Sequence, residues 1–164
     1  MLRLTSLLIL GLSCHGFGQT LTGQVYMLAE DFSADKCEAF AECDCCSGDI
    51  YFLSADKFCF VSRCISGDSY FMGSYSTKAS KLRLAFGKKY VDEITDEEYN
   101  VTKLETKTKN TDPIELDIAR CGQKIRLTHA TIREWKNGSR YEQKDEALMM
   151  KELMTSKTWL QLSR

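Results

Sequence analysis

The fold is decided by four segments: Asp49-Ile-Tyr-Phe-Leu-Ser54, Phe58-Cys-Phe-Val-Ser-Arg-Cys64, Tyr70-Phe-Met-Gly-Ser-Tyr75 and Lys81-Leu-Arg-Leu-Ala-Phe86. In the second segment Phe58 and Phe60 fall on one face of a strand, and Cys59 and Val61 fall on the other. Short turns containing Asp, Gly and Lys separate the four segments. Four short strands joined by tight turns predict an antiparallel meander.

The pattern continues on both sides of this meander. We expect further strands over residues 22–28, 99–109, 114–118, 124–127 and 131–135, with Asn137-Gly138 as a turn. Residues 92–98 are acidic and predict a loop, while residues 29–41 predict a helical turn that starts at Ser33. Residues 142–154 are rich in helix formers, and the tail beyond them is expected to dock on the sheet. The predicted fold is mainly β: a small barrel or curved sheet with one C-terminal helix.

The N-terminus resembles an export signal. Arg3 precedes a short apolar run, which is shorter than the ~20 residues that span a bilayer. Small residues at Gly16 and Gly18 predict cleavage after residue 18, so residues 1–18 form the expected signal peptide. The alternative is a lipoprotein signal that leaves a lipid anchor on Cys14. Either interpretation predicts an exported protein, periplasmic or secreted, with no transmembrane segment in the mature chain.

Length and charge limit the remaining possibilities. Residues 19–164 suit a single β-rich domain with one core. The 22 basic and 23 acidic residues nearly balance, which argues against a nucleic-acid binder. No serine–histidine–aspartate order, phosphate loop or catalytic carboxylate pair is evident, so we expect no enzyme activity.

Cysteine is the most informative residue type. The mature chain carries seven cysteines, an odd number, so at least one is free, binds metal or pairs with another chain. One hypothesis joins them in disulfides that pin the segment before Asp49 to the hairpin carrying Cys59 and Cys64, as is usual after export. Cys45 and Cys46 are adjacent and are expected to reach different partners. The seven are Cys37, Cys43, Cys45, Cys46, Cys59, Cys64 and Cys121.

The other hypothesis is a thiolate metal site. Cys37, Cys43, Cys45 and Cys46 lie within ten residues, and thiolates favour Cu(I) and Zn. His129 is the one histidine left after cleavage; it is a candidate ligand or a base for Cys121, but we expect a surface or capping role.

The meander, with Gly73-Ser-Tyr75 and Lys81-Leu-Arg-Leu84, resembles the small lipocalin-like β-barrels of bacterial envelopes. More loosely, it is similar to the copper-responsive envelope lipoproteins, which place a Cys-x-x-Cys before the first of these strands. Cys43-Asp-Cys-Cys46 stands in the matching place. The resemblance implies a barrel fold and, by analogy, a small ligand or an envelope protein as partner.

Three functions therefore follow from the sequence. The first is a non-enzymatic exported barrel, stabilised by disulfides, that binds an unknown ligand or partner and needs no cofactor. The second is a Cu- or Zn-binding or sensing protein of the cell envelope. The third is a thiol–disulfide oxidoreductase working through Cys43 and Cys46, which would need an accessible thiol of low pKa.

Overall fold

A computed structural model describes residues 21–164 of the chain. The expected signal peptide, residues 1–18, and the candidate lipid anchor at Cys14 lie outside the described residues. The strands are β1 (Val25–Ala29), β2 (Asp31–Ser33), β3 (Glu38–Phe40), β4 (Ser47–Phe52), β5 (Lys57–Arg63), β6 (Ser69–Lys78), β7 (Lys81–Thr95), β8 (Val101–Thr108), β9 (Ile114–Cys121), β10 (Lys124–Thr128) and β11 (Asn137–Arg140). The helices are α1 (Gln143–Thr155) and α2 (Lys157–Leu162).

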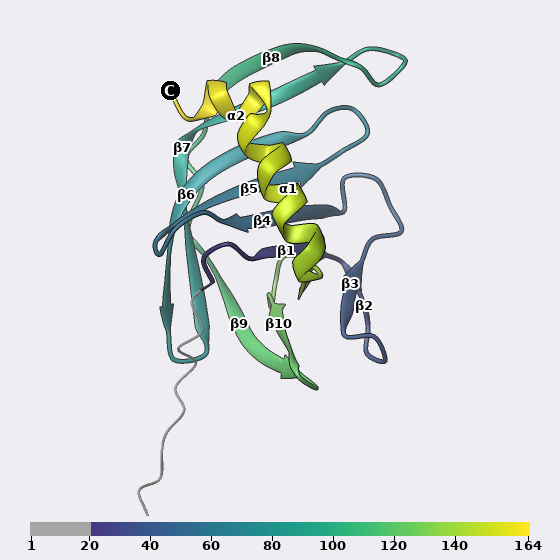
Figure 1. The fold of residues 1–164 in the computed structure, drawn as a ribbon, viewed down its shortest axis with the longest axis vertical. Helices are drawn as coiled ribbons and strands as arrows, with labels where there is room; N and C mark the ends of the chain where they lie inside the picture. Colours follow the sequence, from purple (N-terminus) through teal and green to yellow (C-terminus); the bar gives the residue numbers. More distant parts are fainter. Residues whose placement is uncertain (1–20) are drawn as a thin grey trace, which may run out of the picture.

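Eight strands close into an antiparallel barrel (Figure 1). Their order is β6-β5-β4-β1-β11-β10-β9-β7, and the barrel closes because β7 also pairs with β6. The long strand β7 extends beyond the barrel and carries β8 on its second half. A separate hairpin, β2–β3, lies between β1 and β4 in the sequence. The predicted mainly β fold is confirmed, and of the two architectures expected it is the closed barrel.

Alternation along the strands separates two apolar clusters. Phe58 and Phe60 belong to the cluster that fills the barrel, while Cys59 and Val61 belong to a second cluster that includes residues of both helices. The predicted faces of β5 are therefore confirmed. The fully buried residues of the interior include Tyr26, Leu28, Ile50, Phe52, Leu82, Leu84 and Leu116.

The C-terminal helix expected over residues 142–154 is α1, and the tail beyond it docks as the short helix α2. Ser156 separates them: its backbone N–H donates to the Leu153 carbonyl, and its hydroxyl accepts from the Trp159 N–H at 3.0 Å. The two helices cover the outer face of β1, β4, β5 and β6 (Figure 1), where Leu153 and Leu162 are buried.

Four local predictions were wrong in whole or in part. Residues 29–41 contain the β2–β3 hairpin rather than a helical turn, because Ala39 bonds to Ser139 and Cys37 is bridged across the molecule. The loop expected over residues 92–98 is confirmed only for residues 96–98. Residues 92–95 belong to β7, where Asp92 accepts from the Ser69 hydroxyl at 2.6 Å and pairs with Lys107 at 2.7 Å.

The last strand is also displaced from its predicted place. Residues 131–135 form a loop, and Asn137-Gly138, expected as a turn, begins β11. The Asn137 side chain is satisfied within the sheet, since it donates to the Glu30 carbonyl at 2.6 Å. Gly138 lies against Leu28 and Leu127, where an added Cβ would approach Leu28 Cδ2 to 2.6 Å. Close packing, rather than a turn, explains this glycine.

Candidate functional site

A cleft of about 520 Å³ opens at one end of the barrel, which is within the usual range for small-molecule sites. Three segments distant in the sequence enclose it: the β2–β3 hairpin, the β9–β10 hairpin and the first turn of α1. The lining includes Met27, Ala39, Gln123, Ile125, Ser139 and Gln143. Sequence reasoning singled out none of these residues, because only the closed barrel brings them together.

Covalent and polar contacts fix the two hairpins that form the walls. The Cys37–Cys121 disulfide joins the β2–β3 turn to the end of β9 across 84 residues. Lys124 donates to the Lys36 carbonyl and to the Glu38 carboxylate, at 3.2 Å each. The Ala39 backbone N–H donates to the Ser139 hydroxyl at 2.8 Å. Both walls are therefore held in place before any ligand arrives.

The third wall is anchored by a buried carboxylate. Glu146, on α1, accepts from the Val25 backbone N–H at 2.9 Å and from two guanidinium nitrogens of Arg140 at 2.8 and 2.7 Å. The hydrogen bonds that Arg140 donates to Glu146 raise the pKa of Arg140 above its usual value. Tyr26 lies opposite Arg140 on the neighbouring strand, and burial raises the pKa of the Tyr26 hydroxyl to about 12, so this hydroxyl stays neutral.

Paired charges leave the cleft without a dominant sign. Arg140 is matched by Glu146, Lys124 by Glu38, and Lys144 by Glu142 at 2.9 Å. Apolar surface is supplied by Met27, Ala39 and the half-buried Ile125. Nine of the fourteen lining residues are polar or charged, so the lining suits a small molecule that carries several polar groups beside an apolar part.

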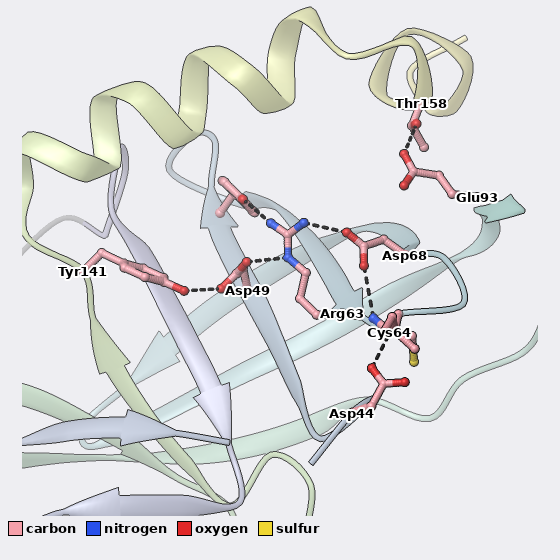
Figure 2. A network of polar contacts seen from close by, with 10 residues as sticks. Asp44, Asp49, Arg63, Cys64, Asp68, Glu93, Tyr141 and Thr158 are labelled. Carbon is pink, nitrogen blue, oxygen red and sulfur yellow. Dashed lines mark hydrogen bonds and ion pairs between the residues drawn. The ribbon is translucent and has the colours of Figure 1, made fainter. Parts of the chain in front are cut away.

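A second polar cluster braces the barrel beneath α1 (Figure 2). The guanidinium of Arg63 donates to Asp49 at 2.7 Å, to Asp68 at 2.6 Å and to the Tyr51 hydroxyl at 3.0 Å. The Tyr141 hydroxyl donates to the other Asp49 oxygen at 2.8 Å. This cluster joins β4 and β5 to the segment that leads into α1.

The tyrosines in this cluster act as neutral donors or acceptors. Burial, reinforced by the nearby Asp49 carboxylate, raises the pKa of Tyr51 and Tyr141 well above their usual value. Asp44 extends the network to the cysteine loop, since it accepts from the backbone N–H of Ile65 at 2.7 Å and of Cys45 at 2.9 Å. With every group matched, the cluster stabilises the fold and presents no free reactive group.

The cysteines form three disulfides: Cys37–Cys121, Cys43–Cys46 and Cys45–Cys64. The adjacent Cys45 and Cys46 reach different partners, as expected. One bridge ties the loop before Asp49 to the β5 hairpin, but through Cys64 alone. Cys59 is free and fully buried, and burial raises the pKa of its thiol to about 12. Disulfides of this number indicate an oxidising compartment outside the cytoplasm.

The candidate metal ligands fall into separate places. Cys43 and Cys46 lie with Glu30, and Cys45 and Cys64 lie with Asp44; the ligand atoms within each group lie within 4.8 Å of one another. Cys37 is bridged to Cys121 instead. Bridged sulfurs are not thiolates, and the thiolate is the form that binds metal. The metal site thus stays a prediction for the reduced protein.

His129 has the capping role that we expected. Its Nδ1 accepts from the backbone N–H groups of Thr131 at 3.1 Å and Ile132 at 2.9 Å. Burial lowers the pKa of the imidazole, which matches a neutral ring accepting at Nδ1. Cys121, the nucleophile considered for it, is bridged.

The barrel interior is filled by aromatic rings. Phe60 lies 4.6 Å from Trp135 between ring centroids, and Phe71 stacks on Tyr90 at 4.8 Å. Trp135, which packs with these rings, lies just before the first residue of β11, whereas Arg140, the last residue of β11, lines the cleft. The partly buried rings and the cleft therefore lie at opposite ends of the barrel.

No protein-family model matches this chain, and no curated protein matches it either. Among solved structures, the fold is similar to that of a streptavidin-like protein from Bacteroides eggerthii DSM 20697. The TM-score is 0.58 at 10% sequence identity, over 85% of this chain and 92% of that chain. This likeness supports the small β-barrel fold alone; it does not extend to the copper-responsive lipoproteins. Within residues 21–164, no helix is long and apolar enough to cross a membrane.

Proposed function

We propose that this protein is a non-enzymatic, exported binding domain that takes a small, partly apolar molecule in the cleft beside α1. One observation carries the proposal: the cleft has the volume of a ligand site, and its walls are fixed in advance. Walls that do not have to be ordered on binding lower the entropic cost of association. The likeness to a streptavidin-like barrel supports a binding role by analogy of fold.

A dye-binding experiment tests this site. The probe is 1-anilinonaphthalene-8-sulfonate, whose rings fit the apolar surface around Ile125 and whose sulfonate matches Lys124. Ile125→Trp fills the cleft and should abolish saturable fluorescence enhancement. Ile114→Trp is the matched control, because Ile114 also packs partly buried on the interior cluster but lies outside the cleft. Equal loss in both variants, or none in Ile125→Trp, would refute the assignment.

Export is part of the proposal. Residues 1–18 would be removed as a signal peptide, or Cys14 would be retained with a lipid, and the three bridges match the oxidising compartment reached by either route. Intact mass of the protein recovered from its native host distinguishes a chain that starts at Gln19 from one with a diacylated Cys14. A chain that retains residues 1–18 in the cytoplasm would contradict both.

A metal-binding role for the reduced protein is the second candidate. If Cys43–Cys46 were reduced, two thiolates would lie beside the Glu30 carboxylate, a donor set that suits Zn²⁺. The test is zinc titration by calorimetry before and after reduction by a phosphine. We expect zinc to bind only after reduction, and the Glu30→Gln variant to lose this binding. If zinc binds in neither state, the zinc hypothesis is refuted. A separate titration with Cu(I) tests the copper hypothesis.

A further inference from the structure

Strand β8 presents an open edge. Seven of its eight residues pair with β7 on one side, and within residues 21–164 no other strand pairs with it. Figure 1 shows β8 as the outermost strand at the end of the molecule away from the β9–β10 hairpin. A strand edge of this length offers a row of unpaired N–H and C=O groups to another chain.

The register with β7 shows which backbone groups are open. The Lys109 N–H donates to the Lys88 carbonyl at 2.8 Å, so this pair is a hydrogen-bonded pair of the ladder. Because such pairs alternate, residues 103, 105 and 107 bond to β7, while Leu104, Thr106 and Thr108 direct their backbone groups outwards. The irregularity opposite Ile94 and Thr95 lies at Thr102, so the regular open edge runs from residue 104 to residue 108.

The charges on this edge select a partner strand. Glu105 and Lys107 lie on one face of β8, two residues apart. Within the chain Glu105 pairs with Lys103 at 2.6 Å and Lys107 with Asp92 at 2.7 Å, and their side chains stay 34% and 42% exposed, so each can also meet a charge on a second strand. In an antiparallel pair with the same strand of a second copy, centred on Thr106, Glu105 lies opposite Lys107 of the second copy, and Lys107 lies opposite its Glu105. Shifting the centre to residue 105 instead places Glu105 opposite Glu105 and Lys103 opposite Lys107. Like charges directly opposite each other are destabilising, whereas opposite charges stabilise the pair.

We propose that two copies of this chain associate through β8, antiparallel about a two-fold axis at Thr106, to form one continuous sheet across both barrels. Thr106 would face its symmetry mate, a cross-strand pair that favours hydrogen bonding. The Thr106 hydroxyl already accepts from Gln161 of α2 at 2.9 Å, which places α2 beside the axis. Leu160 of that helix, next to Gln161 in the sequence, is 49% exposed.

Analytical ultracentrifugation over a series of protein concentrations tests the association. A reversible monomer–dimer equilibrium is expected, weaker at high salt because the matched charges are exposed. Glu105→Lys and Lys107→Glu each place like charges in both symmetry-related pairs and should each raise the dissociation constant by about tenfold or more. Lys78→Glu is the matched control, since it makes the same charge change at an exposed site at the opposite end of β7 from β8, and the dissociation constant should not rise.

Mixing the two variants separates a lost contact from a lost fold. A Glu105→Lys chain with a Lys107→Glu chain restores both opposite-charge pairs, so the mixture should form a heterodimer that is tighter than the homodimer of either variant. Circular dichroism and melting curves check that each variant is folded. A monomer at every concentration, unaffected association in Glu105→Lys, or a mixture that stays monomeric would each overturn the proposal. Dye binding in the cleft is independent of this result.

Discussion

The Cys37–Cys121 disulfide should contribute more to stability than either other bridge, because it closes the longest loop. It links residues 84 apart, against 19 for Cys45–Cys64 and 3 for Cys43–Cys46. Loop-closure entropy then gives about 4–5 kcal/mol for Cys37–Cys121, about 3 for Cys45–Cys64 and about 2 for Cys43–Cys46. A loss of about 4–5 kcal/mol would lower the Tm of a domain of this size by roughly 10–20 °C.

Urea denaturation of Cys37→Ala/Cys121→Ala measures this contribution directly. Alanine keeps a Cβ at Cys37, where φ is 54°, so the backbone strain of that turn is the same in both proteins. The matched control is Cys43→Ala/Cys46→Ala, which removes the shortest loop. The free energy of unfolding should fall about twice as far in the first variant as in the control. Equal losses in the two variants would refute the argument from loop length.

Three further predictions concern single side chains. Arg63→Ala leaves Asp49, which is 4% exposed, with Tyr141 alone; because the Arg63 side chain is itself 38% exposed, the free energy of unfolding should fall by about 2 kcal/mol, and a loss below about 1 kcal/mol in urea denaturation would contradict a stabilising pair. Because the folded pKa of His129 lies below its unfolded value of 6.5, stability should be full above pH 6.5 and fall as the pH drops through the folded pKa. His129→Asn keeps an acceptor and should remove this part of the pH dependence; an unchanged difference between pH 7.5 and pH 5 would refute it. Cys59, with its pKa raised to about 12, should resist iodoacetamide in the folded protein and react once denatured without reduction, as mass spectrometry would show; rapid labelling of the folded protein would contradict its burial.

Much of the barrel was predictable because its strands alternate strictly. From sequence alone, the alternation along β5 places Phe58 and Phe60 on the inner face and Cys59 and Val61 on the outer face, as the structure has them. Where prediction failed, tertiary contacts overrode a local signal. Asn137-Gly138 is a common turn pair, yet it lies in β11 because only glycine fits against Leu28 and Leu127.

The candidate site was much less predictable than the fold. Adjacent Cys45 and Cys46 indicated different partners, but which cysteines pair depends on where barrel closure places β9 relative to the β2–β3 hairpin. The cleft depends on the same closure, since Ala39, Ile125 and Gln143 come from three distant segments and carry no motif.

The most direct test of the proposed binding site is a chemical-shift map. Isotope-labelled protein would be titrated with a library of small aromatic acids and amines, and the backbone amide shifts followed by NMR. Binders should shift the amides around the cleft, at Ala39, Lys124, Ile125, Ser139 and Gln143. Shifts confined to the aromatic end of the barrel near Phe71 and Trp135, or no saturable shift with any compound, would contradict it.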